Sequence, residues 1–598
     1  MAEPQTKLPK FETDNFRFQE MLRLRYPVDA WAREINEYLL THRLRWLMQS
    51  YQTYDSAFTY DHSFNENIFD STAVLAIRTA SAGWLEGCTS PASPWVALGV
   101  KDDAKAKLPP VKQYLDITNK ATLAIYDQSN FYTQMLNHFL DYLCLPAAVT
   151  LIEKDPKYGL RFTTLSWGCY VLDVDENGDV NTIGREEEYE VRQLVPKFCK
   201  MMDNGEYDLS NLTDATADYW RTGTPESLNR RIMVRHIIRP NPDHDPSKPQ
   251  DIYKKWISRY WEKSAPDESD KYLRQSGYDW FPAIVNRWNS RSQEIYANDC
   301  PALQVLSDIK QLYKNTEDQN FHLDKVLDPP LTGPEAFLVD VIQKGPGGFT
   351  PDNTTDAEKG LRPLYQITAD IKWVNDKIGD LRAIINRGFF VDMFQALSVL
   401  RQRMTGQITA AEVDQLKAEK LVELGPNIQG VYRSLRHLID VTYIIENEMG
   451  LIPPAPQMLA GQELPPEFIS PFAMAQRAAV LSLYDKLMQT ANGMIEAGFE
   501  DVKLIVNVRS ILEKICKVFN LPWDTLNPED VVNQMKQQMA AAQQAKTQQE
   551  GALAATGAAK NLSQADTGGD NLLTKMLAMS RAGQVAPQAG GQPMQAAA

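Results

Sequence analysis

Two long helical segments that flank a short insert dominate the middle of the sequence. Pro301 suits the first turn of a helix, and the predicted helix runs to Leu327, after which Asp328 and two prolines stop it. Its length is about 40 Å at the usual rise per residue. A second helix is predicted over 366–387. Because these helices are similar in length and are separated by 328–365, we expect an antiparallel hairpin with a small subdomain at its tip.

The second helix of this pair carries a narrow apolar stripe. Its members recur at alternating spacings of four and three residues and are Ile367, Ile371, Val374, Ile378, Leu381 and Ile385. A repeat of 3.5 residues on an otherwise polar helix is typical of a seam that packs on neighbouring helices. We therefore expect this seam to be the packing surface of a stem-like hairpin.

The N-terminal half mixes two kinds of apolar periodicity. Helical spacing predicts two or three amphipathic helices with a solvated face over 14–52, a buried helix ending at Gly87, and one long helix over 111–145. Alternation predicts strands over 161–165, 169–174, 180–183, 231–239 and 251–261. The expected fold class is mixed α+β and mainly α.

The C-terminal half reads as helical, with an unstructured end. Thr409 and Glu412 form a capping box, so a helical block is expected over 409–449, interrupted by Gly425 and Pro426. Further helices are expected over 470–517 and 529–549. Residues 551–598 are rich in Ala, Gln and Gly and lack aromatics, which predicts a mobile tail.

A hairpin and a calcium loop compete for one segment. Asn177 and Gly178 lie between two predicted strands, which is a strong hairpin signal because type I′ turns need positive φ. Together with Asp173 and Asp175 they also occupy four ligand or turn positions of an EF-hand loop. The twelfth position, where that loop needs glutamate, is Gly184. The hairpin is therefore favoured.

No pattern in the sequence indicates catalysis. It holds no nucleophile elbow, HExxH, Walker A motif or dinucleotide fingerprint after a strand, and no catalytic, cofactor or metal residue is assigned. Asp243, His244 and Asp245 offer metal-binding or acid-base chemistry, but neighbours in an extended loop do not converge on one point, so a solvated turn is favoured. A structural role is also favoured for three histidines in predicted strands or helices: His236, His322 and His437.

Charge and cysteine content exclude several classes of protein. With 77 acidic and 62 basic residues the formal charge is −15, which argues against a non-specific binder of nucleic acid or anionic membranes. The polar start, Met1 to Phe11, lacks the apolar run of a secretory signal, and no apolar run is long enough to span a bilayer. Six cysteines without a CxxC pair are expected to be buried thiols in a reducing compartment: Cys88, Cys144, Cys169, Cys199, Cys300 and Cys516.

Segments from about residue 14 to 550 together resemble the portal, or head-to-tail connector, proteins of short-tailed, podovirus-type bacteriophages. They are, in chain order, Phe69 to Thr72, Ala80 to Trp84, Thr89 to Pro91 with Trp95, Arg287 and Trp288, Glu294 to Tyr296, Pro301 and Ala302, Asp308 to Lys310, Pro329 and Pro330, Ile408 to Val413, Leu424 to Pro426, and Gly450 to Pro453. Each segment is weak alone. Their common order and spacing make the resemblance specific.

The resemblance implies a ring, usually of twelve copies, at one capsid vertex. The implied regions are 1–300 for the first part of the wing, 301–327 and 366–390 for the stem helices, 328–365 for the clip, 391–470 for the tunnel-loop region and long wing helices, 471–527 for helical wing or crown, 528–550 for a crown or barrel helix, and 551–598 for the tail. Implied partners are double-stranded DNA, the terminase motor, a tail adaptor, and the major capsid and scaffolding proteins, with no membrane. The implied location is the virion, and the host cytoplasm during assembly.

The resemblance also suggests a channel loop after the second stem helix. Arg401, Gln402 and Arg403 precede the capping box, and arginines repeated around a ring are able to grip phosphates inside an acidic tunnel. An equal alternative is that the two arginines pair with acidic residues of a neighbouring subunit. For the whole chain, the alternative function is a cytosolic helical scaffold or adaptor without catalytic activity.

Overall fold

The computed structural model describes residues 10–41, 68–102, 105, 108–265, 271–291, 294–327, 331–332, 362–363, 371–394, 410–459, 464–473, 487–494, 511–512 and 531–546. The chain forms two compact units, Met1–Asn520 and Leu521–Ala598. In the second unit the described residues are the helix 531–546, inside the predicted range 529–549.

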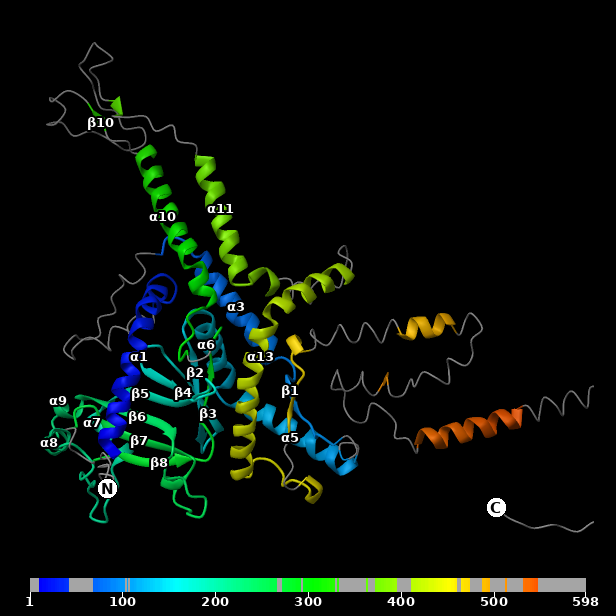
Figure 1. The fold of residues 1–598 in the computed structure, drawn as a ribbon, viewed down its shortest axis with the longest axis horizontal. Helices are drawn as coiled ribbons and strands as arrows, with labels where there is room; N and C mark the ends of the chain where they lie inside the picture. The colour runs from blue at the N-terminus through cyan, green and yellow to red at the C-terminus, as the bar shows by residue number, and fades with distance from the viewer. Residues whose placement is uncertain are drawn as a thin grey trace, which may run out of the picture. The chain divides into compact units, whose positions relative to one another are not determined.

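The first unit combines helices with antiparallel sheets (Figure 1). Its helices are α1 (Lys10–Tyr38), α3 (Thr72–Cys88), α5 (Pro109–Gln128), α6 (Phe131–Cys144), α7 (Val191–Phe198), α8 (Asp214–Thr222), α9 (Pro225–Leu228), α10 (Pro301–Leu327), α11 (Ile371–Gly388) and α13 (Ala410–Glu448). The strands are β1 (Val96–Leu98), β2 (Ala148–Asp155), β3 (Gly159–Leu165), β4 (Tyr170–Val174), β5 (Val180–Glu190), β6 (Arg231–Pro240), β7 (Trp256–Glu262), β8 (Arg274–Tyr278), β9 (Ala283–Asn286), β10 (Leu331–Thr332), β11 (Arg362–Pro363) and β12 (Pro466–Phe468).

In the described residues the strands form one five-stranded sheet, one three-stranded sheet and two two-stranded pairs. The largest has the order β4-β5-β6-β7-β8, and a second has the order β3-β2-β9. The short pairs β1-β12 and β10-β11 each join segments that are far apart in the sequence. The mixed α+β class predicted from the sequence is confirmed.

The range predicted to hold two or three amphipathic helices, 14–52, is described in part. Residues Lys10–Tyr38 form one helix, α1, which continues through Pro27, and 42–52 lie outside the described residues. Its side chains Phe18 and Met21 pack on the five-stranded sheet, and Ala32 and Ile35 join the main core. Packing of this long buried stripe offsets the hydrogen bond that a proline removes from a helix.

The predicted helix over 111–145 is two helices, α5 and α6. The break falls at Ser129 and Asn130 because the Asn130 side chain hydrogen-bonds outside the helix. Its amide donates to the Phe162 carbonyl at 2.7 Å and accepts from the Phe162 amide at 2.9 Å. The pairing with β3 turns the chain, so a local side-chain bond prevails over helical continuation.

The predicted interruption at Gly425 and Pro426 is also wrong, because α13 runs unbroken through both. An interior proline costs about 3 kcal/mol in an exposed helix. Here the buried row Leu424, Ile428 and Val431 packs into the core on both sides of Pro426. Tertiary burial of that row therefore keeps the helix continuous.

Two strand predictions need smaller corrections. The hairpin β4-β5 forms as expected, but only Gly178, with φ +83°, adopts positive φ, so the turn is not type I′. The Asp175 amide donates to the Asp179 carbonyl across the turn. The strand expected over 251–261 begins only at Trp256, because Asp251–Tyr253 form a 3-10 turn, η3.

The core centres on helix α3. Trp84 is fully buried and its ring contacts the rings of Phe139, Tyr142, Trp288 and Phe472, at centroid distances between 5.5 and 6.2 Å. These rings come from α6, from the segment before α10 and from the segment after β12. One side chain thus ties together parts of the chain that are hundreds of residues apart.

Two glycines on α3 let further rings approach its backbone. A Cβ atom on Gly83 would lie 2.1 Å from Phe394 Cδ1, and one on Gly87 would lie 2.4 Å from Phe472 Cε2. These distances are far below van der Waals contact. Gly83 and Gly87 therefore form a notch in α3, and larger residues there would displace the two phenylalanines.

We predict that Gly87→Ala destabilises the protein. The added methyl gains about 1 kcal/mol of helix propensity, but displacing Phe472 from the notch costs about 1–3 kcal/mol or more. The net result should be a lower melting temperature in thermal unfolding. Gly379→Ala on α11 is the matched control, because nothing lies within 4 Å of its Cβ position. That control should raise the melting temperature slightly, and an equal rise in both variants would contradict the notch.

Candidate functional site

The hairpin of α10 and α11 is buried only toward its base. Helices α10 and α11 lie side by side (Figure 1). Buried side chains on α10 end at Tyr313, and on α11 they begin at Ile378. Farther out, the Gln319 side-chain amide donates to Asn375 Oδ1 at 2.7 Å. No side chain described in 314–327 or 372–377 is buried, so the outer half of the hairpin is accessible.

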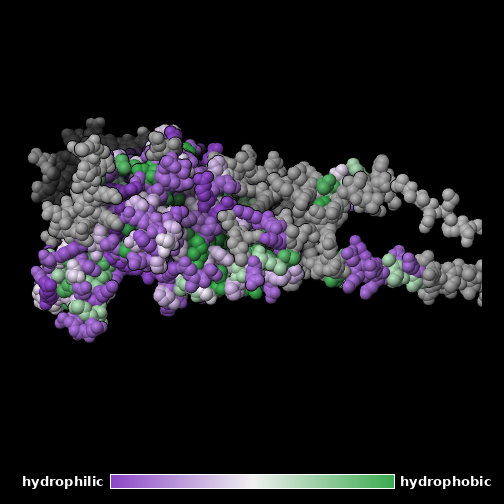
Figure 2. All heavy atoms as spheres, turned by 60° about the horizontal axis from the view of Figure 1, so that its bottom comes forward, coloured by the Kyte–Doolittle hydropathy of each residue, from purple (hydrophilic) through white to green (hydrophobic). Residues whose placement is uncertain are grey.

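This outer half exposes large apolar side chains. Phe321 is 59% exposed, Leu327 81% and Trp373 70%. Figure 2 shows that the surface of the described residues is otherwise largely hydrophilic on the face in view, with smaller apolar areas. Several large apolar side chains exposed on one part of a hairpin indicate a contact surface. We call these three residues the outer apolar set.

The predicted seam residues follow the same division. Ile378, Leu381 and Ile385 are buried, and Val374 is half-buried. Ile371 is the first residue of α11. Ile367 lies outside the described residues.

An ion pair fixes the base of the hairpin to the start of α3. The Arg382 Nη2 and Nε atoms donate to Asp70 Oδ2 at 2.8 and 3.0 Å, and the Thr72 amide donates to Asp70 Oδ1 at 2.7 Å. Burial raises the pKa of the Asp70 carboxyl, but the bonds from Thr72 and the charge of Arg382 outweigh it and lower that pKa below its ordinary value. Asp70 therefore stays ionised and holds α11 in place.

Helix α1 braces α10 from another side. The Tyr313 hydroxyl donates to the Tyr38 carbonyl at 3.0 Å, and Lys310 pairs with Glu34 at 2.8 Å. Burial, and then the charge of Asp70, raise the pKa of the Tyr313 phenol, so it remains a neutral donor. The base of the hairpin is thus held by α1, α3 and the core together.

The insert between the helices closes on a short ribbon. Strands β10 and β11 pair antiparallel, with Leu331 opposite Pro363 and Thr332 opposite Arg362. The chain therefore leaves for the insert and returns from it at one point. The rest of the predicted clip, 328–365, lies outside the described residues.

The predicted channel residues Arg401, Gln402 and Arg403 lie outside the described residues too. The described chain leads up to them at Phe394, which sits against Gly83, and resumes at Ala410, where α13 begins. The flank that precedes them is therefore packed on the core through Phe394.

A buried carboxylate attaches α1 to the large sheet. Asp14 accepts from Arg239 at 2.7 Å, from Tyr272 at 3.0 Å and from Arg259. Asp14 is 1% exposed, and its partners come from β6, β7 and the segment before β8. An ion cluster this well hydrogen-bonded fixes the register of the helix on the sheet.

The large sheet also contains a buried serine and histidine that resemble a nucleophile and base. His236 Nε2 lies 2.8 Å from Ser258 Oγ, but Arg185 Nε donates to His236 Nδ1 at 2.8 Å. The imidazole proton is therefore on Nε2, which donates to the serine and cannot accept its proton. Burial and the charge of Arg185 lower the pKa of His236. The pair is structural, as predicted for His236.

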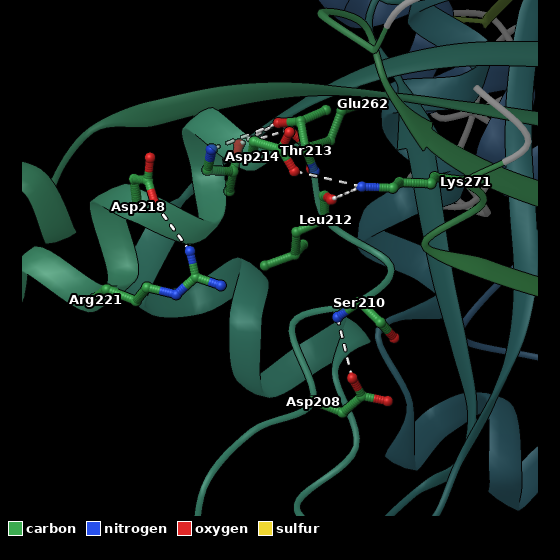
Figure 3. Close-up of polar contacts among 10 residues, drawn as sticks. Asp208, Ser210, Leu212, Thr213, Asp214, Asp218, Arg221, Glu262 and Lys271 are labelled. Carbon is green, nitrogen blue, oxygen red and sulfur yellow. Dashed lines mark hydrogen bonds and ion pairs between the residues drawn. The ribbon is translucent and has the colours of Figure 1, made fainter. Parts of the chain in front are cut away.

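Glu262 has a comparable structural role at the end of β7 (Figure 3). Its carboxylate accepts from the Thr213 amide at 2.8 Å, from the Thr213 hydroxyl at 2.7 Å and from the Thr216 hydroxyl at 2.6 Å. Thr213 is the N-cap of α8, where a negative charge is favoured by the helix dipole. The contact fastens the small helical layer of α7, α8 and α9 to the sheet.

The two sequence candidates for metal binding are ordinary turns. Asp175 Oδ1 accepts from the amides of Asn177 and Asp179, each at 2.9 Å, and Asp173 pairs with Arg17. In the other loop, His244 Nδ1 donates to the Tyr253 carbonyl oxygen at 2.8 Å. No group of three or more metal-binding side chains occurs among the residues the structure describes.

The cysteines in the described ranges are free thiols. Cys88, Cys144, Cys199 and Cys300 are buried, and Cys169 is half-buried. Burial raises the pKa of the Cys300 thiol to about 12 and that of Cys199 to about 11. These thiols are therefore protonated and unreactive at neutral pH. Cys516 lies outside the described residues.

The sequence analysis missed the outer apolar set and the notch. Trp373 lies on the polar side of its helix, outside the predicted apolar stripe. A large aromatic residue on the polar side of a helix is a sequence signal of a contact surface. Gly83 and Gly87 are spaced by four residues on a buried helix, a spacing that puts both on one face. In the described parts of the chain, no helix is both long and apolar enough to cross a membrane.

Comparison with known proteins confirms the resemblance found in the sequence. The chain is 28% identical over 518 residues to the portal protein of Salmonella phage epsilon15, which covers 86% of this chain and 89% of the relative. It is 30% identical over 469 residues to the probable portal protein of Bordetella phage BPP-1, which covers 78% of this chain and 80% of the relative. A family model described as bacteriophage head to tail connecting protein matches residues 13–526. The chain therefore belongs to the bacteriophage head to tail connecting protein family.

Proposed function

We propose that this protein is the portal subunit of a tailed phage. Copies of the chain form a ring at one capsid vertex, and the genome enters and leaves the head through it. The observation that carries this function is membership of the family over residues 13–526, together with two portal-named relatives. Those names do not favour the alternative, a cytosolic scaffold or adaptor.

The α10-α11 hairpin supports a stem role in that ring. Its base is fixed to the core by the Asp70–Arg382 pair, and its outer half presents the outer apolar set. In a ring the stem helices of neighbouring copies lie side by side, which would remove these side chains from water. We assign 301–327 and 366–390 to the stem and 328–365 to the clip.

We assign the remaining regions of the chain from the same portal interpretation. The sheets and helices of 1–300, with 391–470, form the wing, and 471–527 forms helical wing or crown. The helix 531–546 exposes Met535 and Met539, which are 50% and 72% exposed, on one side. An exposed apolar side on a helix of this length needs a partner for stability. This supports a crown or barrel helix over 528–550 that packs against other copies, followed by a tail.

The charge of the subunit suits a conduit for DNA. Duplex DNA that crosses a stem of about 40 Å presents on the order of 24 phosphates. A wall of lysines would bind these phosphates and hold the DNA, whereas a subunit of formal charge −15 repels it. DNA, the terminase motor, a tail adaptor, and the major capsid and scaffolding proteins are the proposed partners in the virion and during assembly in the host cytoplasm.

Assembly provides the first test. Trp373→Ser should leave the subunit folded, because the side chain is 70% exposed, but should weaken the ring. Native mass spectrometry should then show fewer rings and more monomers at equal protein concentration, with an unchanged melting temperature of the monomer. Ile444→Ser on α13 removes another exposed apolar side chain, 38% exposed, and should assemble normally. Full ring assembly by Trp373→Ser would contradict the stem assignment.

The clip assignment predicts the effect of an internal deletion. Removing 335–360 leaves the β10-β11 ribbon to close the hairpin, so rings should still form. Binding of the terminase motor or the tail adaptor should be lost in a pull-down with either partner. The opposite result, in which adaptor binding survives but rings are lost, would place the clip elsewhere in the chain.

The channel-loop hypothesis predicts a defect in DNA handling alone. Arg401→Gln with Arg403→Gln removes two positive charges per subunit, so DNA retention or packaging should fall while native mass still shows rings. The difference in DNA retention between the unmodified protein and the double variant should shrink as the salt concentration rises, because salt screens the phosphate contacts. Normal packaging by the double variant would favour the alternative, in which both arginines pair with a neighbouring subunit.

A further inference from the structure

A line of polar contacts joins α5 to α13 inside the main core. The Thr122 hydroxyl donates to Glu446 Oε2 at 2.7 Å, and the Tyr126 hydroxyl lies 2.8 Å from Thr442 Oγ1. Tyr126, Thr442 and Glu446 have no exposed surface, and Thr122 is 6% exposed. All four belong to the contact that fixes the C-terminal part of α13.

The Glu446 carboxyl group has a hydrogen-bond partner for only one of its two oxygens among the described residues. Its second carboxyl oxygen, Oε1, is buried and has no hydrogen-bond partner among the described residues. Burying an ionised carboxylate with a single hydrogen bond costs far more than burying the neutral acid. Burial accordingly raises the pKa of Glu446 from 4.5 to about 7, although the bond from Thr122 lowers it. In the neutral acid the contact with Thr122 can also run in the opposite direction, with Glu446 as donor.

No described neighbour offers Glu446 a compensating positive charge. Of the titratable side chains on α5, Tyr114 and Tyr126 are buried, whereas Lys112, Asp116, Lys120 and Asp127 are half-buried or exposed, and Lys120 pairs with Asp116. On α13, the Tyr443 hydroxyl lies 3.0 Å from that of Tyr114. Burial raises the pKa values of Tyr126 and Tyr443, and the charge of Glu446 raises them further.

The strands packed on α13 add charged residues that point to other partners. Lys154 of β2 pairs with Glu448, and Glu153 of β2 faces Arg185. The remaining charged side chains of these strands are not hydrogen-bonded to Glu446: Asp155 of β2, Arg161 of β3 and Glu467 of β12. Glu446 therefore lies in a neutral, hydroxyl-rich contact.

We propose that Glu446 is a proton-operated latch, which in its neutral form holds the C-terminal part of α13 against α5 and on ionisation loosens that contact. The side chains that contact one another around Glu446 carry hydroxyl groups, which can exchange hydrogen-bond partners without leaving a charge unpaired. Ionisation instead places a charge in the core with one hydrogen bond. The latch is a property of the folded subunit and does not depend on the portal function.

The direction of the pH effect follows from the raised pKa. The neutral acid is favoured in the folded protein, so its contribution is fully present below about pH 4.5 and is lost as the pH rises through about 7. Glu446→Gln keeps the shape and the acceptor for Thr122 but cannot ionise. It should therefore stay latched at every pH.

Hydrogen exchange of the full-length protein tests the latch. Peptides from 114–126 and 438–450 should exchange equally in the unmodified protein and in Glu446→Gln at pH 5. At pH 8.5 local opening should be up to on the order of 100-fold more frequent in the unmodified protein. Comparing the two proteins at the same pH removes the intrinsic pH dependence of exchange. Glu448→Gln, two residues away, removes the exposed pair with Lys154, so any change in exchange that it causes should be the same at pH 5 and at pH 8.5.

A second variant keeps the test decisive if Glu446→Gln folds poorly. Thr122→Val preserves shape but removes the bond that lowers the pKa of Glu446, so the pH at which α13 loosens should move upward. Equal protection of the unmodified protein and Glu446→Gln at pH 8.5, or a midpoint unmoved by Thr122→Val, would overturn the latch. Native mass spectrometry of the same samples reports ring assembly separately, so a failed latch is distinguishable from a failed portal assignment.

Discussion

The notch in α3 is the contact on which the rest of the first unit depends. Gly87 lets Phe472 pack on Trp84, and Gly83 accommodates Phe394, whose ring lies 6.3 Å from that of Phe472. Trp84 also contacts rings from α6 and from the segment before α10. Aromatic side chains bury large areas, and edge-to-face pairs add roughly 0.5–1.5 kcal/mol beyond that area. The base of the hairpin, the approach to the channel residues and the end of the β1-β12 pair therefore share one anchor.

Sequence reasoning predicted the parts of the fold whose ends are marked by nearby proline or glycine residues. Pro301 and the prolines after Leu327 bound α10, and Gly178 marks the β4-β5 turn. The apolar stripe of α11 predicted which side is buried toward its base, since a 3.5-residue repeat defines one side of a helix. In each case the determining residues are neighbours in the sequence, so no knowledge of distant contacts is needed.

The parts that sequence reasoning missed depend on distant contacts. Asn130 ends α5 only because Phe162, 32 residues away, offers its backbone, and α13 passes Pro426 only because its buried row finds the core. The outer apolar set of the candidate site was missed for a related reason. A stripe shows which residues face inward, whereas exposure of Trp373 follows from where the hairpin leaves the core. Glu446 is unremarkable in the sequence, and its chemistry arises entirely from what α5 places beside it.

The base and the outer half of the α10-α11 hairpin differ in how far their apolar side chains are buried. Its base is buried within the subunit, whereas Phe321 and Leu327 on α10 and Trp373 on α11 are largely exposed among the described residues. The two helices present different surfaces, so in the proposed ring α11 of one copy would lie against α10 of the next. A contact between unlike surfaces repeats from copy to copy and ends only when the rotation closes a ring. Closure also gathers the acidic subunits around one axis, where their mutual repulsion must be offset by burial of these apolar side chains. In the proposed ring, burial of these exposed apolar residues would therefore supply the free energy that offsets the repulsion between acidic subunits.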